Sequence, residues 1–312
     1  MKTCFLFPGQ GAQYPGMGKD LFEESARVKE LFEHASESTG IDMQRLIFEG
    51  TEEELKATDK TQVAITLVNL AAAAVLEESG VEPDGCAGFS LGEYAALYQA
   101  GVIGLDDLFP IVKARGELME KASRHLDSPS GNPGMAAVIG LSFEEVTRIV
   151  GRLDQVYLAN YNSPQQFVVS GTSDGLERAE KAFEEAEAKR FIPLKVSGPF
   201  HCPLLEEAGK GLEQELAKYT FSDPKLPVYA NVTGKRIASG EEARQLCVRQ
   251  IVSTVLWVDE EQSLLADGFD RILEVGPGTV LAGLWKRVNR DLKCVSAGTL
   301  EAIEAIGKVA EG

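Results

Sequence analysis

The chain has 312 residues, of which 44% are hydrophobic and 25% are charged, a balance typical of a globular protein with a sizeable buried core. Its formal charge of −17 at pH 7 repels nucleic-acid phosphates and anionic lipid, which argues against non-specific binding to nucleic acids or membranes. The five cysteines are scattered, which argues against a disulfide framework or a zinc site and favours a reducing compartment.

The first third of the chain predicts a buried strand followed by helices. Residues Thr3 to Phe7 form a short apolar run that ends at Pro8-Gly9, as expected for a strand entering a turn. This run is too short for a signal peptide. A helix is expected from Leu21 to Thr39. The apolar stretch from Val63 to Leu76 is too short to span a bilayer, and it predicts a buried helix from Gln62 that ends at Gly80.

Strands and helices continue to alternate further along the chain. Gly85 to Phe89 predicts a second strand, and Leu91 to Ala100 predicts a helix that ends before Gly101. The apolar segment from Arg271 to Val275 predicts a strand that leads through a glycine-rich turn into another helix. Alternating helices and short apolar strands favour an α/β fold with a parallel sheet covered by helices on both faces.

Between residues 128 and 197 the order of predicted elements changes. A linker of residues 128–134, rich in Pro, Gly and Ser, precedes this segment. The elements that follow are a strand (Met135 to Ile139), a helix (Phe143 to Leu153), two strands (Val156 to Asn160 and Phe167 to Ser170), a second helix (Leu176 to Ala188) and a last strand (Phe191 to Val196). This β-α-β-β-α-β order is the ferredoxin-like pattern. We therefore expect residues 128–197 to form an inserted small subdomain, and residues 1–127 and 198–312 to form the large one.

The segment Gly88-Phe89-Ser90-Leu91-Gly92 fits the G-x-S-x-G nucleophile elbow, in which a serine occupies a sharp turn between a strand and a helix. Side chains beside such a tight turn would clash, which explains the two glycines. The turn exposes the hydroxyl at the N-terminus of the helix, where backbone N–H groups favour a developing oxyanion. The strand and helix predicted on either side favour this interpretation over a helix N-cap serine. Ser90 is therefore the predicted nucleophile of an acyl-transferring or hydrolytic enzyme.

A nucleophilic serine needs a general base, and the chain contains three histidines. His34 and His125 stand among charged residues and are predicted to be solvated on the surface. His201 lies in the loop of residues 197–205 and follows the serine in chain order, as in α/β-hydrolases. Since no aspartate or glutamate stands out as its partner, we expect a Ser–His dyad in which a backbone carbonyl or an amide holds the histidine.

Six motifs resemble those of the malonyl-CoA:acyl carrier protein transacylase family, and they follow the family order over nearly the whole chain. They are Phe7-Pro-Gly-Gln-Gly-Ala-Gln13, Gly88-Phe-Ser-Leu-Gly-Glu-Tyr94, Asn160-Tyr-Asn-Ser-Pro164, Gly198-Pro-Phe-His-Cys-Pro203, Asn231-Val-Thr-Gly234 and Glu274-Val-Gly-Pro-Gly278. The resemblance implies an α/β-hydrolase-like large subdomain with a short parallel sheet, together with an inserted ferredoxin-like small subdomain.

The resemblance also implies roles for the residues at matching positions. Ser90 would take the malonyl group from coenzyme A as an ester, with His201 as the base. The backbone N–H groups of Gln10 and Leu91 would form the oxyanion hole. Arg115 matches the family arginine that binds the free carboxylate of malonate, a role that suits a planar guanidinium better than a lysine. Without the resemblance, Arg115 would be interpreted as a surface helical residue.

Four further positions are implied to lie near the substrate. Gln250 matches an amide near the active site, and Asn231 would help to orient His201, although a structural role in loop hydrogen bonds accounts for both residues equally well. In the wider family, enzymes that prefer malonyl over methylmalonyl have an aliphatic residue at the position of Leu91 and a phenylalanine at that of Phe200. They leave less room for an α-methyl branch, although one methyl group is worth only about 1–3 kcal/mol of discrimination.

Two positions depart from the family pattern. Phe89 stands where the family usually has histidine, directly before the nucleophile, and Thr61-Gln-Val63 replaces the commoner Thr-Gln-Pro. The second difference is a mild change at the start of a helix. The first is expected to alter the polarity of the pocket or the rate. The nucleophile, base, oxyanion donors and arginine are all retained, so we expect activity to survive.

We predict a ping-pong enzyme that transfers malonyl from malonyl-CoA to the phosphopantetheine thiol of acyl carrier protein for fatty-acid elongation. We expect it to act as a cytoplasmic monomer without metal or cofactor. The alternatives are a trans-acting acyltransferase of polyketide synthases, a carrier-thioester hydrolase with the same dyad, and a non-catalytic carrier-docking component. Because such carriers are acidic, docking would need a positive rim. Candidates for this rim are Lys189, Arg190, Lys195, Lys286 and Arg287, although solvated surface charge is the simpler explanation for each of them.

Overall fold

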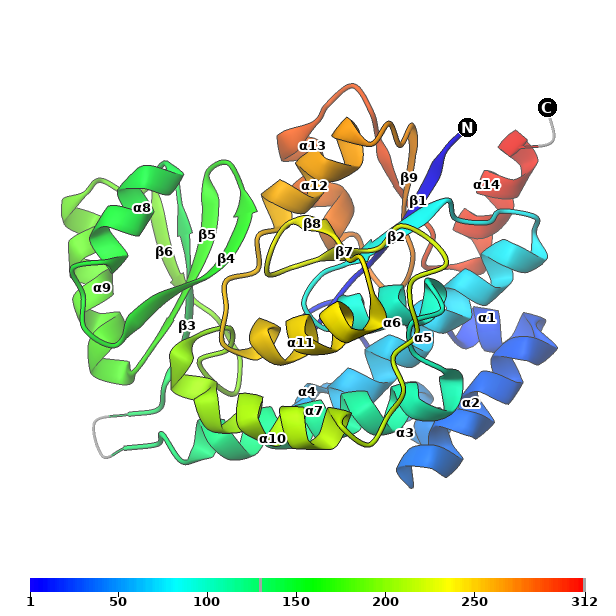
Figure 1. Ribbon diagram of the computed structural model, residues 1–312, viewed down its shortest axis with the longest axis horizontal. Helices are drawn as coiled ribbons and strands as arrows, with labels where there is room; N and C mark the ends of the chain where they lie inside the picture. The colour runs from blue at the N-terminus through cyan, green and yellow to red at the C-terminus, as the bar shows by residue number, and fades with distance from the viewer. Residues whose placement is uncertain (129–130, 311–312) are drawn as a thin grey trace.

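The computed structural model describes residues 1–128 and 131–310, which form a four-stranded parallel sheet and a four-stranded antiparallel sheet, both packed against helices, and a short two-stranded antiparallel sheet (Figure 1). The predicted linker 128–134 includes Pro129 and Ser130, which lie outside the described residues. The strands are β1 (Thr3–Phe7), β2 (Gly85–Gly88), β3 (Gly134–Ile139), β4 (Val156–Ser163), β5 (Gln166–Gly171), β6 (Arg190–Pro193), β7 (Tyr229–Ala230), β8 (Lys235–Arg236), β9 (Arg271–Glu274) and β10 (Cys294–Ser296).

The helices connect these strands and follow the last of them. They are α1 (Lys19–Glu24), α2 (Ala26–Thr39), α3 (Met43–Phe48), α4 (Glu52–Lys56), α5 (Thr58–Glu78), α6 (Gly92–Gln99), α7 (Leu105–Arg124), α8 (Phe143–Val150), α9 (Ser173–Glu185), the 3₁₀ turn η1 (Pro203–Leu205), α10 (Glu206–Leu216), α11 (Gly240–Ile251), α12 (Trp257–Ala266), α13 (Val280–Val288) and α14 (Leu300–Ala310).

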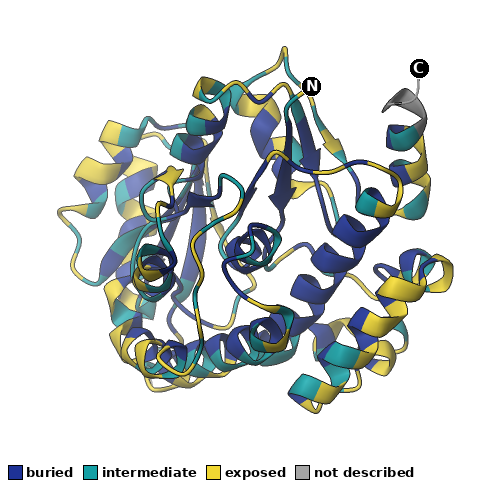
Figure 2. Cartoon of the chain, turned by 45° about the vertical axis from the view of Figure 1, so that its right-hand side comes forward, coloured by how far each residue is buried: buried dark blue, intermediate teal, exposed yellow. Residues whose placement is uncertain are grey.

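The parallel sheet has the strand order β10-β9-β1-β2, with every neighbouring pair parallel. Side chains of β1 alternate between its two faces. Phe5 and Phe7 pack into the hydrophobic cluster that contains α5 and α6, whereas Cys4 and Leu6 pack into the cluster that contains α12 and α13. Because helices cover both faces, β1, β2 and most of β9 lie in the buried centre of the protein, whereas the edge strand β10 is partly exposed (Figure 2). The predicted parallel sheet is therefore confirmed.

The N-terminal helices differ from the prediction at one position. The single helix expected from Leu21 to Thr39 is wrong, because α1 ends at Glu24 and α2 begins at Ala26. Ser25 between them has an extended backbone, and its hydroxyl accepts a hydrogen bond from the N–H of Val28. A serine that caps a new helix in this way ends the preceding one.

The buried helix predicted in the first third of the chain is α5, which begins four residues earlier than expected. It is the one helix among the described residues whose length and composition would allow it to cross a membrane, and 89% of its most apolar window is buried within the protein. Its burial on all sides explains the nearly continuous apolar sequence, because neighbouring helices rather than lipid surround it.

The antiparallel sheet has the strand order β4-β5-β3-β6 and is built from consecutive elements in the order β-α-β-β-α-β. Helices α8 and α9 cover one face, where Val138, Phe167 and Phe183 belong to a separate hydrophobic cluster. The last strand, β6, is shorter than the predicted Phe191–Val196. The chain leaves the sheet because it folds back after Leu194, whose carbonyl accepts a hydrogen bond from the N–H of Val196.

The two sheets are joined by backbone hydrogen bonds from β4 to the segment after α11. The N–H of Tyr161 donates to the carbonyl of Val255 at 2.8 Å, and the N–H of Val255 donates to the carbonyl of Ala159 at 2.9 Å. On the neighbouring strand, the hydroxyl of Ser170 donates to the carbonyl of Phe200 at 2.5 Å. The face of the antiparallel sheet opposite α8 and α9 is therefore held against the loop that contains Phe200.

The close approach of β1 to the start of α6 predicts a large cost for any side chain at Gly92. A Cβ atom there would overlap the carbonyl oxygens of Phe7 and Pro8. We expect Gly92→Ala to lower the free energy of unfolding by about 1–3 kcal/mol or more. Chemical denaturation measures this change. The matched control is Gly283→Ala in α13, where a Cβ meets nothing within 4 Å and should stabilise the helix by about 0.5–1 kcal/mol. Equal effects at the two positions would contradict the steric argument.

Candidate active site

Ser90 lies at the sharp turn between β2 and α6 and has a left-handed backbone, with φ of 51°. Its Oγ is 2.7 Å from Nε2 of His201, and its N–H donates to Oδ1 of Asn231 at 2.7 Å. The N-cap residue of α6 is Leu91, and no side chain caps that helix. The alternative of a helix N-cap serine is therefore wrong, because the Ser90 hydroxyl faces a histidine rather than the helix backbone.

His201 is buried in the loop before η1 and also has a left-handed backbone, with φ of 58°. Its Nδ1 lies 2.9 Å from the backbone carbonyl oxygen of Gln250. Because a carbonyl oxygen only accepts, Nδ1 carries the proton in the neutral ring, and Nε2 is left to accept from the Ser90 hydroxyl. A backbone carbonyl, one of the two partners expected from the sequence, holds the ring in the orientation of a general base.

The local backbone of both residues is unusual. Among the non-glycine residues in the described part of the chain, a positive φ occurs only at Ser90, Gln155, Glu187 and His201. Non-glycine residues in this region are held there by their surroundings, and such residues cluster at functional sites. Here the surrounding bonds are those from Ser90 to Asn231, and from Ser170 to the carbonyl that precedes His201.

Burial and the nearby positive charge of Arg115 lower the pKa of His201 to about 4, against a smaller opposing effect of its hydrogen bond to the Gln250 carbonyl. The charged imidazolium is the form that burial disfavours. The neutral imidazole, which is the form that accepts a proton from Ser90, therefore predominates at every pH well above 4.

This lowered pKa predicts that acylation of Ser90 stays fast in mild acid. We expect the acylation rate at saturating acyl donor to be nearly constant from pH 8 to about 5.5 and to reach half of its maximum near pH 4. Quenched-flow mass spectrometry of the intact protein measures the rate, and circular dichroism at each pH checks that the protein is still folded. A midpoint near pH 6.5, the value of an ordinary histidine, would contradict a buried base.

Arg115 projects from α7 into the same site and is only 1% exposed. Its Nη1 donates to Oε1 of Gln62 at 2.8 Å, and its Nη2 donates to Oε1 of Gln250 at 2.9 Å and lies 3.5 Å from Ser90 Oγ. The guanidinium also lies over the ring of Tyr94, 5.4 Å from its centroid. The interpretation as a surface helical residue is therefore wrong, and a fixed positive charge stands beside the nucleophile.

The backbone groups predicted to form an oxyanion hole border the site. Gln10 and Leu91 both line the cavity that contains Ser90, and within the described chain neither N–H donates to another group. The loop of Gln10 lies against the elbow so closely that a Cβ at Gly9 would overlap the carbonyl oxygen of Phe89. The glycine before Gln10 is thus needed for this approach of the two loops.

The cavity around Ser90 has a volume of about 220 Å³ and lies between the two sheets. Phe200, which is buried, lines it together with Leu91, as predicted. Phe89 also lines it, and its ring packs edge-on against Trp257 with centroids 5.3 Å apart. Replacing the usual family histidine by Phe89 therefore adds apolar surface to the wall and leaves the hydrogen bonds of Ser90 in place.

Several residues at the site carry no role in the sequence-based prediction. Asn160, Asn162 and Gln166 extend from β4 and β5 into the cavity. Gln62 holds Arg115, although the sequence marked that position only for a mild change at the next residue. The amide-rich motif at Asn160 was a usable signal for the first group, whereas Gln62 sits in an apolar helix with no local pattern to mark it.

Asn231 and Gln250 bind the nucleophile rather than only the histidine. Asn231 Nδ2 donates to the carbonyl of Gly88 at 2.7 Å and to Oε1 of Glu260 at 2.7 Å, while its Oδ1 accepts from Ser90. None of the hydrogen bonds described for Asn231 goes to His201, so the structural role that the sequence also allowed for Asn231 is the one that these bonds support. Gln250 supplies both the carbonyl that holds His201 and an Nε2 that donates to the Ser90 carbonyl at 3.0 Å.

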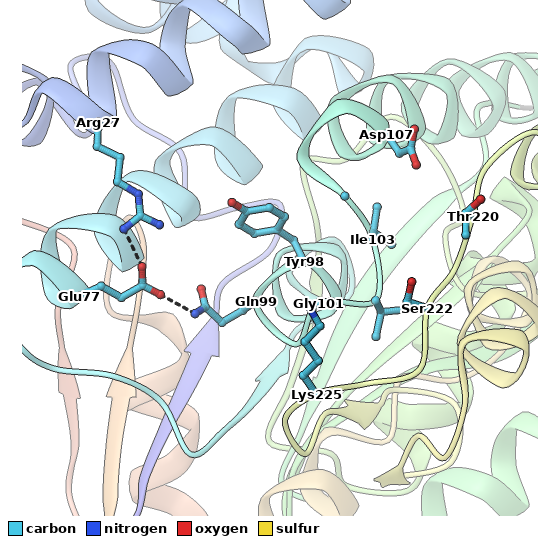
Figure 3. A pocket seen from close by; sticks show the side chains of 12 residues that line it. Arg27, Glu77, Tyr98, Gln99, Gly101, Ile103, Asp107, Thr220, Ser222 and Lys225 are labelled. Carbon is cyan, nitrogen blue, oxygen red and sulfur yellow. Dashed lines mark hydrogen bonds and ion pairs between the residues drawn. The ribbon is translucent and has the colours of Figure 1, made fainter.

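Among the described residues, the other cavities are not lined by Ser90, His201 or Arg115. A larger cavity of about 480 Å³ lies between α2, α5, α6 and the segment that precedes β7, and at its rim Glu77 accepts from Arg27 at 2.7 Å and from Gln99 at 2.6 Å (Figure 3). It contains no predicted site residue. Within residues 1–128 and 131–310, no group of three or more His, Cys, Asp or Glu side chains is placed to hold a metal ion.

The remaining predicted positions lie on the surface. His125 is exposed, and His34 is partly exposed beside Asp106. The lysines and arginines proposed for a positive rim are all exposed: Lys189, Arg190, Lys195, Lys286 and Arg287. Their role in docking stays a prediction.

The sequence matches the family model of the acyl transferase domain over residues 4–307. It is 39% identical to the malonyl CoA-acyl carrier protein transacylase of Bacillus subtilis (strain 168) over 307 residues, which cover 97% of this chain and 95% of the relative. It is 40% identical to the protein of the same name from Escherichia coli (strain K12) over 289 residues, which cover 91% and 92% of the two chains.

A solved structure agrees with these sequence relatives. In the complex of a type II PKS acyl-carrier protein with its malonyl-transacylase, PlMCAT:AntF, the similar chain has a TM-score of 0.94 at 36% identity. The alignment covers 99% of this chain and 100% of that one. Similarity therefore extends over the whole arrangement of both sheets.

Proposed function

Because the chain belongs to the acyl transferase family, we propose that it transfers the malonyl group of malonyl-CoA to the phosphopantetheine thiol of an acyl carrier protein. The observation that carries this proposal is the buried guanidinium of Arg115, 3.5 Å from the Ser90 hydroxyl. A planar cation at that distance suits an acyl group that ends in a free carboxylate. The curated relatives bear the name of this activity, and the solved complex pairs such an enzyme with a carrier protein.

The first half-reaction forms an ester on Ser90. The Ser90 Oγ attacks the thioester carbonyl of malonyl-CoA while Nε2 of His201 takes the hydroxyl proton. The N–H groups of Gln10 and Leu91 stabilise the oxyanion, and the carbon–sulfur bond then breaks. The proton on His201 passes to the departing CoA thiolate. The products are free CoA and malonyl-Ser90, and the histidine is neutral again.

The second half-reaction repeats these steps with the other thiol. His201 takes the proton from the phosphopantetheine thiol, and the sulfur attacks the ester carbonyl. The carbon–oxygen bond to Ser90 breaks and the proton returns to Oγ, so the enzyme is regenerated. Arg115 holds the malonate carboxylate through both halves while the two thiols exchange. The acyl donor and the final product are both thioesters of a phosphopantetheine thiol, so the net exchange needs no energy-supplying co-reactant.

Intact-protein mass spectrometry tests this function. Mixing the protein with malonyl-CoA should add one malonyl group, and peptide mapping should locate it on Ser90. Adding phosphopantetheinylated carrier protein should then remove the group and load the carrier. No adduct would exclude an acyl-enzyme and leave the carrier-docking alternative. An adduct that is lost to water as fast as to the carrier would identify a hydrolase.

The same assay separates the two pathways. We propose fatty-acid elongation as the setting, and loading of a fatty-acid carrier protein in preference to a polyketide carrier supports it. The reverse preference would favour the polyketide alternative. We also propose that the enzyme is a cytoplasmic monomer, in keeping with five cysteines that form no disulfide among the described residues.

The proposed domain division explains how the site is assembled. We propose that residues 1–127 and 198–312 form an α/β-hydrolase-like core and that residues 128–197 form an inserted ferredoxin-like subdomain. The element order of the antiparallel sheet and the position of the cavity between the two sheets support this division.

A further inference from the structure

Glu93 is a fully buried acid that the reaction steps above do not use. It lies three residues after the nucleophile, in the first turn of α6. Its Oε2 accepts hydrogen bonds from the N–H of Asn231 and from Nε2 of Gln250, both at 2.9 Å. Its Oε1 has no hydrogen-bond partner among the residues that the structure describes. A carboxylate in such a position is retained at a cost, since burial of a charge is unfavourable unless it is compensated.

The positive charge of Arg115 can compensate the buried carboxylate of Glu93, because the side-chain amide of Gln250 bridges the two residues. The side chain of Gln250 accepts from Arg115 Nη2 through its Oε1 at 2.9 Å and donates to Glu93 through its Nε2. Arg115 is 1% exposed and Glu93 is 0% exposed, so water screens neither charge. The positive charge of Arg115 favours the ionised form of Glu93, although burial of the carboxyl outweighs this effect.

The other titratable groups around Glu93 have raised pKa values, which favour their neutral forms. Burial raises the pKa of Tyr94 on α6, of Cys247 on α11 and of Glu260 on α12 far above their usual values. Burial raises the pKa of Glu93 itself to about 7, against smaller opposing effects of its two hydrogen bonds and of Arg115. Near neutral pH, Arg115 and Glu93 are therefore the two groups of this cluster that carry charge.

Binding of malonate changes this balance. With Glu93 ionised, Arg115 and Glu93 form a neutral buried pair, and a malonate carboxylate on Arg115 would add an uncompensated negative charge. We infer that Glu93 is the counter-ion of Arg115 in the unloaded enzyme and that it takes up one proton from solvent when the malonate carboxylate binds there. This inference rests on the proposed malonyl function. Glu93 does not touch the substrate, so it acts as a positioning residue through Gln250.

The sign of the resulting pH dependence follows from the linkage between proton and substrate. Because binding takes up a proton, malonyl binding weakens as the pH rises past the titration of Glu93. A bound carboxylate that raises the pKa of Glu93 by one unit weakens binding about five- to tenfold between pH 6.0 and 8.5. Acetyl, which lacks the second carboxylate, has no such dependence. Both donors contain the same CoA phosphates, so titration of these phosphates cancels when binding of malonyl-CoA is divided by binding of acetyl-CoA.

The first test uses the ratio of kcat/KM for malonyl-CoA to that for acetyl-CoA, measured from pH 6.0 to 8.5. In the native enzyme this ratio should fall about five- to tenfold, and in Glu93→Gln, which keeps an acceptor oxygen but not the charge, it should stay constant within about twofold. The matched control is Glu260→Gln, because Glu260 is equally buried but its hydrogen bond goes to Asn231 rather than to Gln250. It should keep the native pH dependence. A constant ratio in the native enzyme, or a native slope in Glu93→Gln, would overturn the inference.

A second measurement does not depend on whether a Glu93 variant folds. Calorimetric titration of Ser90→Ala with malonyl-CoA, in two buffers of different ionisation enthalpy, reports the protons taken up on binding. We expect uptake of about half a proton at pH 7.5 with malonyl-CoA and none with acetyl-CoA. Equal proton uptake for both donors would overturn the inference. If the native protein forms no malonyl ester, the proposed function fails. If the ester forms without proton uptake, only the role of Glu93 fails.

Discussion

Replacing Ser90 by alanine is expected to abolish the malonyl adduct and to slow transfer to the carrier protein by about 10⁴- to 10⁶-fold. Among the described residues, this hydroxyl is the group that contacts His201 Nε2 at the cavity, so its loss leaves the base without a nucleophile. Intact-protein mass spectrometry and a carrier-loading assay measure the two effects. Malonyl-CoA should still bind to this variant, because Arg115 and the cavity are unchanged.

The matched control for this variant is Ser239→Ala. Ser239 is a true N-cap serine, whose hydroxyl accepts from the N–H of Glu242 at the start of α11. Its replacement should lower the free energy of unfolding by about 1 kcal/mol and leave the adduct intact. An adduct that persists in Ser90→Ala would mean that another side chain carries the acyl group.

Replacing Arg115 by alanine is expected to lower the preference for malonyl-CoA over acetyl-CoA on the order of 10²-fold or more. Truncating one partner of a buried, hydrogen-bonded charge pair costs about 2–5 kcal/mol, and of the two acyl groups compared only malonyl carries a carboxylate that can pair with Arg115. The ratio of kcat/KM for the two donors measures the change. The loss should be in malonyl recognition, since the contact between Ser90 and His201 does not include Arg115.

Two variants of the same helix sharpen this prediction. Arg115→Lys keeps a charge but not the planar donors that bind both Gln62 and Gln250, and it should restore only part of the preference. Arg124→Ala removes an exposed arginine that pairs with Glu120 on α7, and it should leave the preference unchanged. An unchanged preference in Arg115→Ala would remove this residue from carboxylate binding.

The features predicted well from the sequence are those set by short segments. β1 lies where its apolar run predicts, and the elbow at Ser90 follows from five consecutive residues between a strand and a helix. The preference for a backbone carbonyl or an amide beside His201 came from the lack of a nearby acid in the sequence. The bond from His201 Nδ1 to the Gln250 carbonyl agrees with it.

The features that escaped prediction depend on contacts between distant segments. Arg115 has the periodicity of a surface helical residue, and it is buried because Gln62 and Gln250, 53 and 135 positions away, bind its guanidinium. Glu93 is a charged residue in an apolar helix, and its partners come from residues more than a hundred positions later. No local pattern encodes such pairs. The helix break at Ser25 is different, because a serine cap is a local signal, although the apolar spacing on either side continues across it.

The strand order of the parallel sheet has a consequence for how the protein is made. β1 lies between β2 and β9 in the sheet, and Thr3 pairs with Arg271. β1 therefore has both of its neighbours only after residue 271 has been synthesised. Ser90 leaves the ribosome well before His201 and Gln250, and its sheet closes only after β9 has been synthesised. A nascent chain that has not reached residue 201 therefore contains Ser90 without its general base, His201. Recovery of activity during refolding is therefore expected to report the meeting of all three segments, because the site needs Ser90, His201 and the Gln250 carbonyl together.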